Sequence, residues 1–128
     1  YIYRTANQKN TIIFYKNADK KKILLFKKKG INLIKSKIIN NRDFDIKSIF
    51  MKLYDLGCRN LLIEGGNELS KTILNKKLFN EFYLFKSPNN LSKVVEHKEF
   101  NSFNVLSLNY KNKNNTKLGK DLITHYKN

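Results

Sequence analysis

A short apolar segment that runs directly into two glycines constrains this chain more than any other feature. Residues 60–63 read Asn-Leu-Leu-Ile and predict a short strand buried on both faces of a parallel sheet. Glu64-Gly65-Gly66 follows at once, and the apolar spacing beyond it predicts a helix. The inward residues of that helix are Leu69, Ile73 and Leu74. The unit is a strand, a tight turn and a helix, as found in α/β proteins.

Upstream, the β-branched and aromatic segment 11–15 predicts a buried strand. Asp19 and Gly30 are placed to begin and end a short helix over 20–29, although a second strand there is the alternative. Residues 31–34 predict a strand. The clearest helix covers 46–56, with Asp45 as its N-cap and Gly57 as its C-terminal stop.

Downstream, the segment 82–85 predicts a strand that ends before Ser87-Pro88. Two further strands are expected over 104–110 and 121–126, separated by a polar, hairpin-like run over 111–117. This order predicts one α/β domain over residues 1–128, with a mainly parallel sheet and antiparallel strands at the C-terminal end. Because the chain begins with Tyr1 and not with Met, we expect it to be a C-terminal fragment of a longer protein.

The composition allows two interpretations of a formal net charge of +16. Only three of the 26 basic residues are arginines, which favours a lysine-rich solvated surface over a nucleic-acid-binding face. A lysine-rich nucleic-acid-binding module remains the alternative function. No run of 18 apolar residues exists and Cys58 is the single cysteine, so we expect a cytoplasmic protein with no membrane segment and no disulfide.

Few residues in the chain suit metal binding or nucleophilic catalysis. Cys58 is expected to be a small buried apolar residue and not a nucleophile. The two histidines, His97 and His125, are too isolated to predict a metal site. No catalytic acid or base can be named from the sequence.

The Gly65-Gly66 turn has the chemistry of a phosphate site. The N–H groups that begin a helix, together with the positive end of its dipole, bind anions, and glycines allow a phosphate to approach the backbone. A purely structural tight turn is the alternative. Glu64 is poorly suited to phosphate and better suited to accept hydrogen bonds from a ligand, or else from neighbouring backbone donors.

Several ordered motifs resemble one family. Beyond Glu64-Gly65-Gly66 and Leu69, the chain carries Leu78-Phe79-Asn80-Glu81, then a strand and Ser87-Pro88, and later Leu118-Gly119-Lys120-Asp121 before its last predicted strand. These resemble the C-terminal reductase domain of the bifunctional riboflavin-biosynthesis deaminase/reductase, in the same order. The resemblance implies a dihydrofolate-reductase-like, three-layer fold that is incomplete at the N-terminus.

The resemblance also implies a reaction and a set of site residues. The cofactor is NADPH, and the reaction reduces the ribosyl group of 5-amino-6-(5-phosphoribosylamino)uracil to ribityl. Glu64 matches a residue that contacts the pyrimidine substrate. The residues expected near the cofactor are Gly65, Gly66, Asn67, Glu68, Leu69, Ser70, Lys71 and Thr72.

The family is commonly dimeric and often fused to an upstream zinc deaminase domain, so both are expected partners by resemblance. The strand over 82–85 is a candidate for a dimer interface. A related reductase acting on another pyrimidine or a pterin is a further alternative, because a fold does not fix a substrate.

Overall fold

The computed structural model describes residues 11–39, 43–88, 110 and 113–128. The chain divides into two compact units, one over residues 1–61 and the other over residues 62–128. The described secondary structure is mixed α/β, as expected from the order of segments in the sequence.

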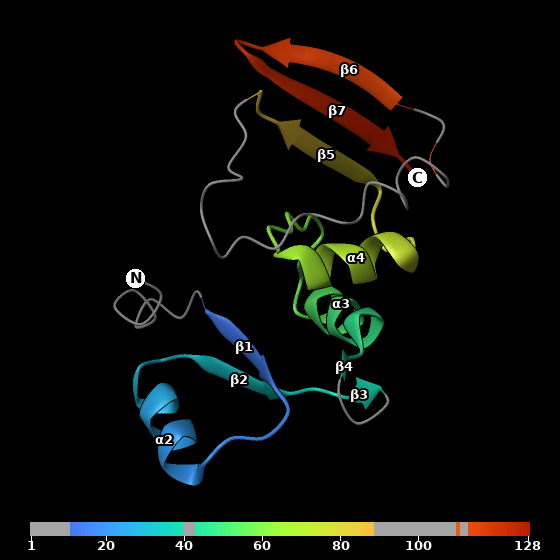
Figure 1. Ribbon diagram of the computed structural model, residues 1–128. Helices are drawn as coiled ribbons and strands as arrows, with labels where there is room; N and C mark the ends of the chain where they lie inside the picture. Colours follow the sequence, from blue (N-terminus) through green and yellow to red (C-terminus); the bar gives the residue numbers. More distant parts are fainter. Residues whose placement is uncertain (1–10, 40–42, 89–109, 111–112) are drawn as a thin grey trace. The chain divides into compact units, whose positions relative to one another are not determined.

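The first unit contains a parallel strand pair and a covering helix. Strand β1 (Ile12–Tyr15) pairs in parallel with β2 (Asn32–Lys35), with Ile13 opposite Leu33. Helix α2 (Lys20–Lys28) connects the two strands, as the crossover of a parallel pair requires, and Figure 1 shows this β1–α2–β2 path. The helical interpretation of residues 20–29 is therefore confirmed, and the strand alternative is wrong.

Local capping explains where both helices of this unit begin. The Asp19 carboxylate accepts a hydrogen bond from the Lys21 N–H at 3.0 Å. The Asp45 carboxylate accepts one from the Ser48 N–H at 3.2 Å and begins α3 (Ile46–Asp55). Gly30 and Gly57, with φ of 75° and 95°, lie beyond the helix ends in the left-handed region that favours glycine.

Two very short strands precede α3 and were not predicted. β3 (Ile38–Ile39) and β4 (Asp43–Phe44) form an antiparallel pair with Ile38 opposite Phe44. Two-residue strands carry too little periodicity to be recognised in a sequence.

The second unit consists of one helix and a three-stranded antiparallel sheet. Helix α4 (Asn67–Asn75) is followed by β5 (Glu81–Lys86), β6 (Lys113–Leu118) and β7 (Asp121–Lys127). The strand order is β5-β7-β6, so the last strand lies in the middle, as Figure 1 shows. Gly119, with φ of 61°, occupies the first position of the two-residue β6–β7 turn, where a type II′ turn requires positive φ.

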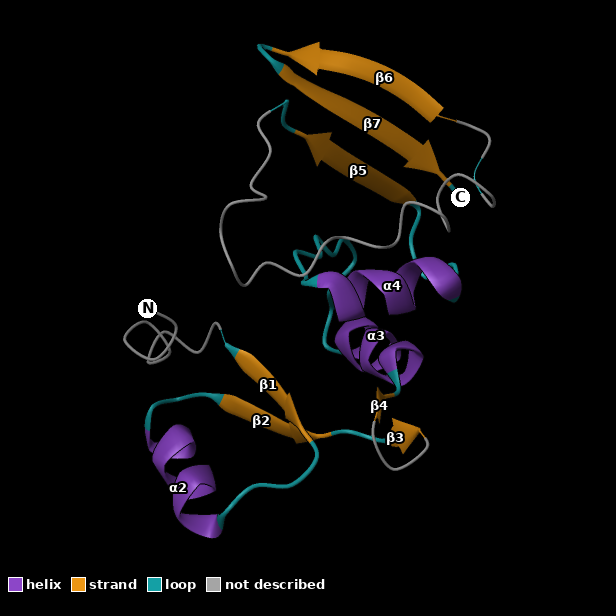
Figure 2. Ribbon diagram, in the orientation of Figure 1, coloured by secondary structure: helices purple, strands orange, loops and turns teal. Residues whose placement is uncertain are grey.

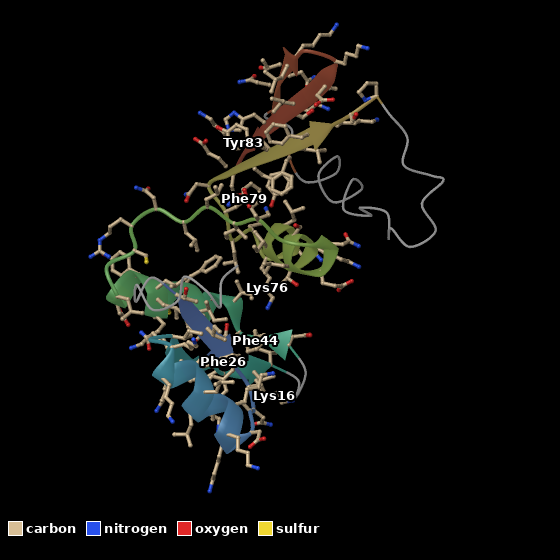
Figure 3. The ribbon with its side chains drawn as sticks, turned by 90° about the vertical axis from the view of Figure 1, so that its left-hand side faces the viewer. Lys16, Phe26, Phe44, Lys76, Phe79 and Tyr83 are labelled. Carbon is tan, nitrogen blue, oxygen red and sulfur yellow. The ribbon has the colours of Figure 1, made fainter. Side chains whose placement is uncertain are left out.

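The core of this unit lies between α4 and one face of the sheet. Leu74, Tyr110 and Tyr126 are buried and pack with Phe79, Phe82 and Leu84. Along β5, Tyr83 and Phe85 alternate with the core residues Phe82 and Leu84, and their side chains are exposed. Figure 3 shows Phe79 near the junction of α4 and the sheet, and Tyr83 on β5. The predicted strand over 82–85 is confirmed, and its two faces have different roles.

The buried strand predicted over residues 60–63 is wrong. These residues form no strand, and Figure 2 draws the connection from α3 to α4 as a loop. Leu61 is 48% exposed and Leu62 is 85% exposed. A strand requires a neighbouring backbone to pair with, and no described strand lies beside this segment. Apolar composition alone therefore misled the prediction.

Three other expectations also need correction. Residues 113–117 of the predicted polar run are not a hairpin loop, because they belong to β6, an exposed edge strand that pairs with β7. Cys58 is exposed and not buried, because the chain leaves α3 just before it. A mainly parallel sheet is not confirmed, since only one of the four described strand pairs is parallel.

The predicted strand over 104–110 lies outside the described residues except for Tyr110, which is not in a strand. His97 also lies outside them. Within the described ranges, no helix is long and apolar enough to span a bilayer.

Candidate functional site at the amino end of helix α4

The amino end of α4 presents backbone donors without helical acceptors. The first backbone hydrogen bond runs from the Ser70 N–H to the Gly66 carbonyl at 3.1 Å. The N–H groups of Asn67, Glu68 and Leu69 precede this bond and have no acceptor within the helix. The N-cap, Gly66, has no side chain that could satisfy them. This end of the helix is therefore able to bind an acceptor group of a ligand.

The two glycines before α4 have different surroundings. A Cβ atom on Gly65 would lie 2.9 Å from Leu69 Cδ2 and 3.1 Å from Leu69 Cβ, so Gly65 allows the turn to pack on the helix. A Cβ atom on Gly66 would meet no described atom within 4 Å. The backbone at Gly66, with φ of −71° and ψ of −180°, is extended and suits any residue. Neither local packing nor backbone conformation among the described residues explains a glycine at position 66.

Glu64 has an exposed carboxylate that accepts no hydrogen bond from the described residues. The interpretation of Glu64 as an acceptor for neighbouring backbone donors is therefore not supported. Glu64 also follows a loop and not the end of a strand, so the sheet-edge geometry expected around it is absent from the described structure. In the chain, Glu64 lies two residues before the N-cap of α4.

The hydroxyl groups in α4 form local hydrogen bonds. Ser70 Oγ donates to the Gly65 carbonyl at 3.5 Å, and Thr72 Oγ1 donates to the Glu68 carbonyl at 2.9 Å. Lys71 is exposed, and Leu69 packs against Gly65. Of the residues predicted near a cofactor, the structure thus gives Ser70, Thr72 and Leu69 a local structural contact.

Asn67 carries a feature that sequence reasoning missed. Its carboxamide Oδ1 is buried and has no hydrogen-bond partner among the described residues. An unpaired buried acceptor costs about 1–3 kcal/mol, so such groups in native proteins usually have a partner. The only signal in the sequence was an asparagine directly after Gly-Gly.

The charge around the amino end is mixed. Glu68 lies in the first turn of α4, where its carboxylate interacts favourably with the positive end of the helix dipole. The same charge opposes an anionic ligand at the same end. An anion at this end would therefore be bound by backbone N–H groups and not by a cluster of cations.

A second polar cluster lies on the exposed face of the sheet. Tyr83 and His125 are cross-strand neighbours whose rings stack at 4.3 Å with an interplanar angle of 1°. Tyr83 donates a hydrogen bond to Glu81 Oε2 at 2.7 Å, and His125 Nε2 lies 3.4 Å from the same oxygen. This hydrogen bond, and then the charges of His125 and Lys127, hold the pKa of Glu81 below its usual range. The cluster ties β5 to β7.

Comparison with known proteins assigns the chain to a family. The model of the RibD C-terminal domain matches residues 2–124, and the chain belongs to this family. The riboflavin biosynthesis protein RibD of Actinobacillus pleuropneumoniae is 28% identical over 87 residues. That alignment covers 68% of this chain and 23% of the Actinobacillus protein, so the chain corresponds to about a quarter of that relative. The resemblance seen in the ordered motifs is confirmed.

Proposed function

We propose that this chain is part of an NADPH-dependent reductase of riboflavin biosynthesis with a dihydrofolate-reductase-like fold. The observation that carries the proposal is the family match over residues 2–124. The substrate is 5-amino-6-(5-phosphoribosylamino)uracil, and its ribosyl group becomes ribityl. NADPH supplies the hydride, and a proton from solution completes the two-electron reduction.

The amino end of α4 fits a dinucleotide phosphate. Gly66 leaves open the space that a Cβ would fill, and the three N–H groups of Asn67, Glu68 and Leu69 supply donors. These residues bind and orient the pyrophosphate of NADPH, and their role is positioning.

Glu64 binds the pyrimidine side of the substrate. Its free, exposed carboxylate can accept hydrogen bonds from the ring N–H or amino groups of an aminouracil. Because it lies two residues before Gly66, it places those groups next to the bound cofactor. The residue orients the substrate and requires no change in its own protonation.

The larger assembly is also a proposal. The chain corresponds to about 23% of its Actinobacillus relative. From the resemblance to the bifunctional deaminase/reductase, we propose a zinc deaminase domain elsewhere in the same protein. We also propose that the protein is a homodimer and acts in the cytoplasm.

Turnover by the full protein that contains this chain tests the function. We expect NADPH oxidation on addition of 5-amino-6-(5-phosphoribosylamino)uracil, with a ribityl product of two mass units more. If NADPH is oxidised only when a different pyrimidine or a pterin is added, the proposed substrate is wrong and the proposed reductase activity stands. Strong, salt-dependent RNA binding without any NADPH binding would contradict the proposed reductase function.

A further inference from the structure

Helix α2 and the residue after it carry an unusual concentration of positive charge. Six of residues 20–29 are lysines, whereas the whole chain has 23 lysines among 128 residues. The segment is therefore more than three times as rich in lysine as the chain, and a composition bias spread evenly over the surface does not account for it. The six residues, all with exposed side chains, are Lys20, Lys21, Lys22, Lys27, Lys28 and Lys29.

The first turn of α2 is charged against the stability of the helix. Lys20, Lys21 and Lys22 lie at its amino end, where the positive end of the helix dipole repels cations. The first turn contains no acidic residue, and the N-cap Asp19 is the only acid between residues 16 and 30. Residues that weaken their own element are typical of positions that serve a function other than folding.

One side of α2 combines exposed leucines with these lysines. The half-buried residues of the helix are Ile23 and Phe26. The opposite stripe, which we call the outer face of α2, follows the spacing i, i+3, i+4, i+7 along one side of a helix. Leu24 is 60% exposed and Leu25 is 48% exposed. The outer face consists of Lys21, Leu24, Leu25 and Lys28.

We propose that the outer face of α2 binds the surface of an anionic lipid membrane, with the helix lying flat on it. The lysine ammonium groups pair with anionic headgroups, and their alkyl stems extend from the helix to reach them. Leu24 and Leu25, between Lys21 and Lys28, enter the boundary between the headgroups and the acyl chains. The contact is peripheral and requires no membrane-spanning helix.

Other anionic partners fit this face less well. A nucleic acid would pair with the lysines and leave both leucines without a use, and the outer face offers no arginine or aromatic ring for stacking on bases. An acidic peptide helix binds in a groove, whereas the outer side of a single helix is a ridge. The proposal is independent of the reductase function, because α2 contributes no residue to the amino end of α4.

Sedimentation of the full protein with lipid vesicles tests the proposal. We expect binding to vesicles of phosphatidylcholine and phosphatidylserine in equal amounts, little binding to pure phosphatidylcholine, and weaker binding as salt is added. Lys21→Gln/Lys28→Gln should lower the affinity roughly twentyfold, since each lysine near an anionic surface contributes about fivefold. Lys113→Gln/Lys117→Gln makes the same charge change at exposed positions on β6 and is the matched control, with little effect.

The leucines need their own variants. Leu24→Ala/Leu25→Ala should lower vesicle affinity about tenfold with the charge unchanged. Leu118→Ala, at a leucine that is 62% exposed on β6, is the control and should have little effect. Circular dichroism of each variant checks that the helices are kept.

Several results would overturn the proposal and leave the reductase function standing. One is the absence of binding to the mixed vesicles. Another is an equal loss in the α2 and β6 lysine variants, which would make the binding a matter of net charge. A third is unchanged vesicle affinity in Leu24→Ala/Leu25→Ala. Tighter binding of a single-stranded RNA than of the vesicles, lost in the same α2 lysine variant, would assign the outer face to nucleic acid instead.

Discussion

The hydroxyl of Tyr110 donates a hydrogen bond to the Leu74 carbonyl at 3.1 Å, inside the core of the second unit. The two residues are 36 positions apart in the chain. The Tyr110 ring also packs on Phe79, with ring centroids 5.1 Å apart. The contact fixes the last turn of α4, the helix whose other end carries the candidate site.

Removing this hydroxyl should destabilise the unit modestly. In Tyr110→Phe the Leu74 carbonyl keeps its bonds from the Lys76 and Lys77 N–H groups, so it is not left unpaired. We expect a loss of about 0.5–1.5 kcal/mol in the free energy of unfolding, measured by urea denaturation of the full protein. Tyr54→Phe, at a tyrosine that is 61% exposed, is the control and should have little effect. Equal stability of both variants would mean that the Tyr110 bond contributes nothing.

Acid should weaken the link between β5 and β7. Because the Tyr83 hydroxyl bond, and then the charges of His125 and Lys127, lower the pKa of Glu81 from 4.5, the ionised form is favoured in the folded state. Its contribution is therefore present above pH 4.5 and is lost as the pH falls below that value. We expect Glu81→Gln to lower Tm at pH 7 and to change it less at pH 3. A constant difference across this range would count against a role for the Glu81 charge.

Neutralising Glu64 should affect the substrate and spare the cofactor. Glu64→Gln replaces a charged acceptor by a neutral amide of the same shape, and charge-assisted hydrogen bonds contribute about 1.5–3 kcal/mol. We therefore expect kcat/KM to fall roughly ten- to a hundredfold, with NADPH affinity little changed. Glu81→Gln makes the same charge change on β5 and serves as the control, with kcat/KM unaffected. Normal turnover by folded Glu64→Gln would remove Glu64 from the substrate site.

The local elements of this fold were predictable, and the pairing of strands was not. Asp19 and Asp45 cap their helices with their own carboxylates, so the helix boundaries are encoded within a few residues. Residues 61–63 are apolar but have no described strand beside them, whereas the polar β6 forms a strand because β7 pairs with it. Strand formation depends on distant partners, and periodicity within a segment does not report them.

The same distinction applies to the candidate site. Gly65 and Gly66 were recognised as a turn before a helix, because glycine has a local conformational meaning. Their separate roles became clear only from Leu69, which packs against position 65 and leaves position 66 open. The unpaired Asn67 oxygen depends on burial by surrounding atoms, which no pattern in the sequence reports.

The most direct test of the account is the dissociation constant of NADPH for Gly66→Val in the full protein. The extended backbone at Gly66 accepts valine, and the added side chain enters the space assigned to the pyrophosphate. We predict at least a tenfold loss of NADPH affinity, a smaller loss in Gly66→Ala, and an unchanged Tm for both. In contrast, Gly65→Ala should lower Tm, because its Cβ would lie 2.9 Å from Leu69 Cδ2. An unchanged NADPH dissociation constant in folded Gly66→Val would contradict the account and leave this turn a structural one.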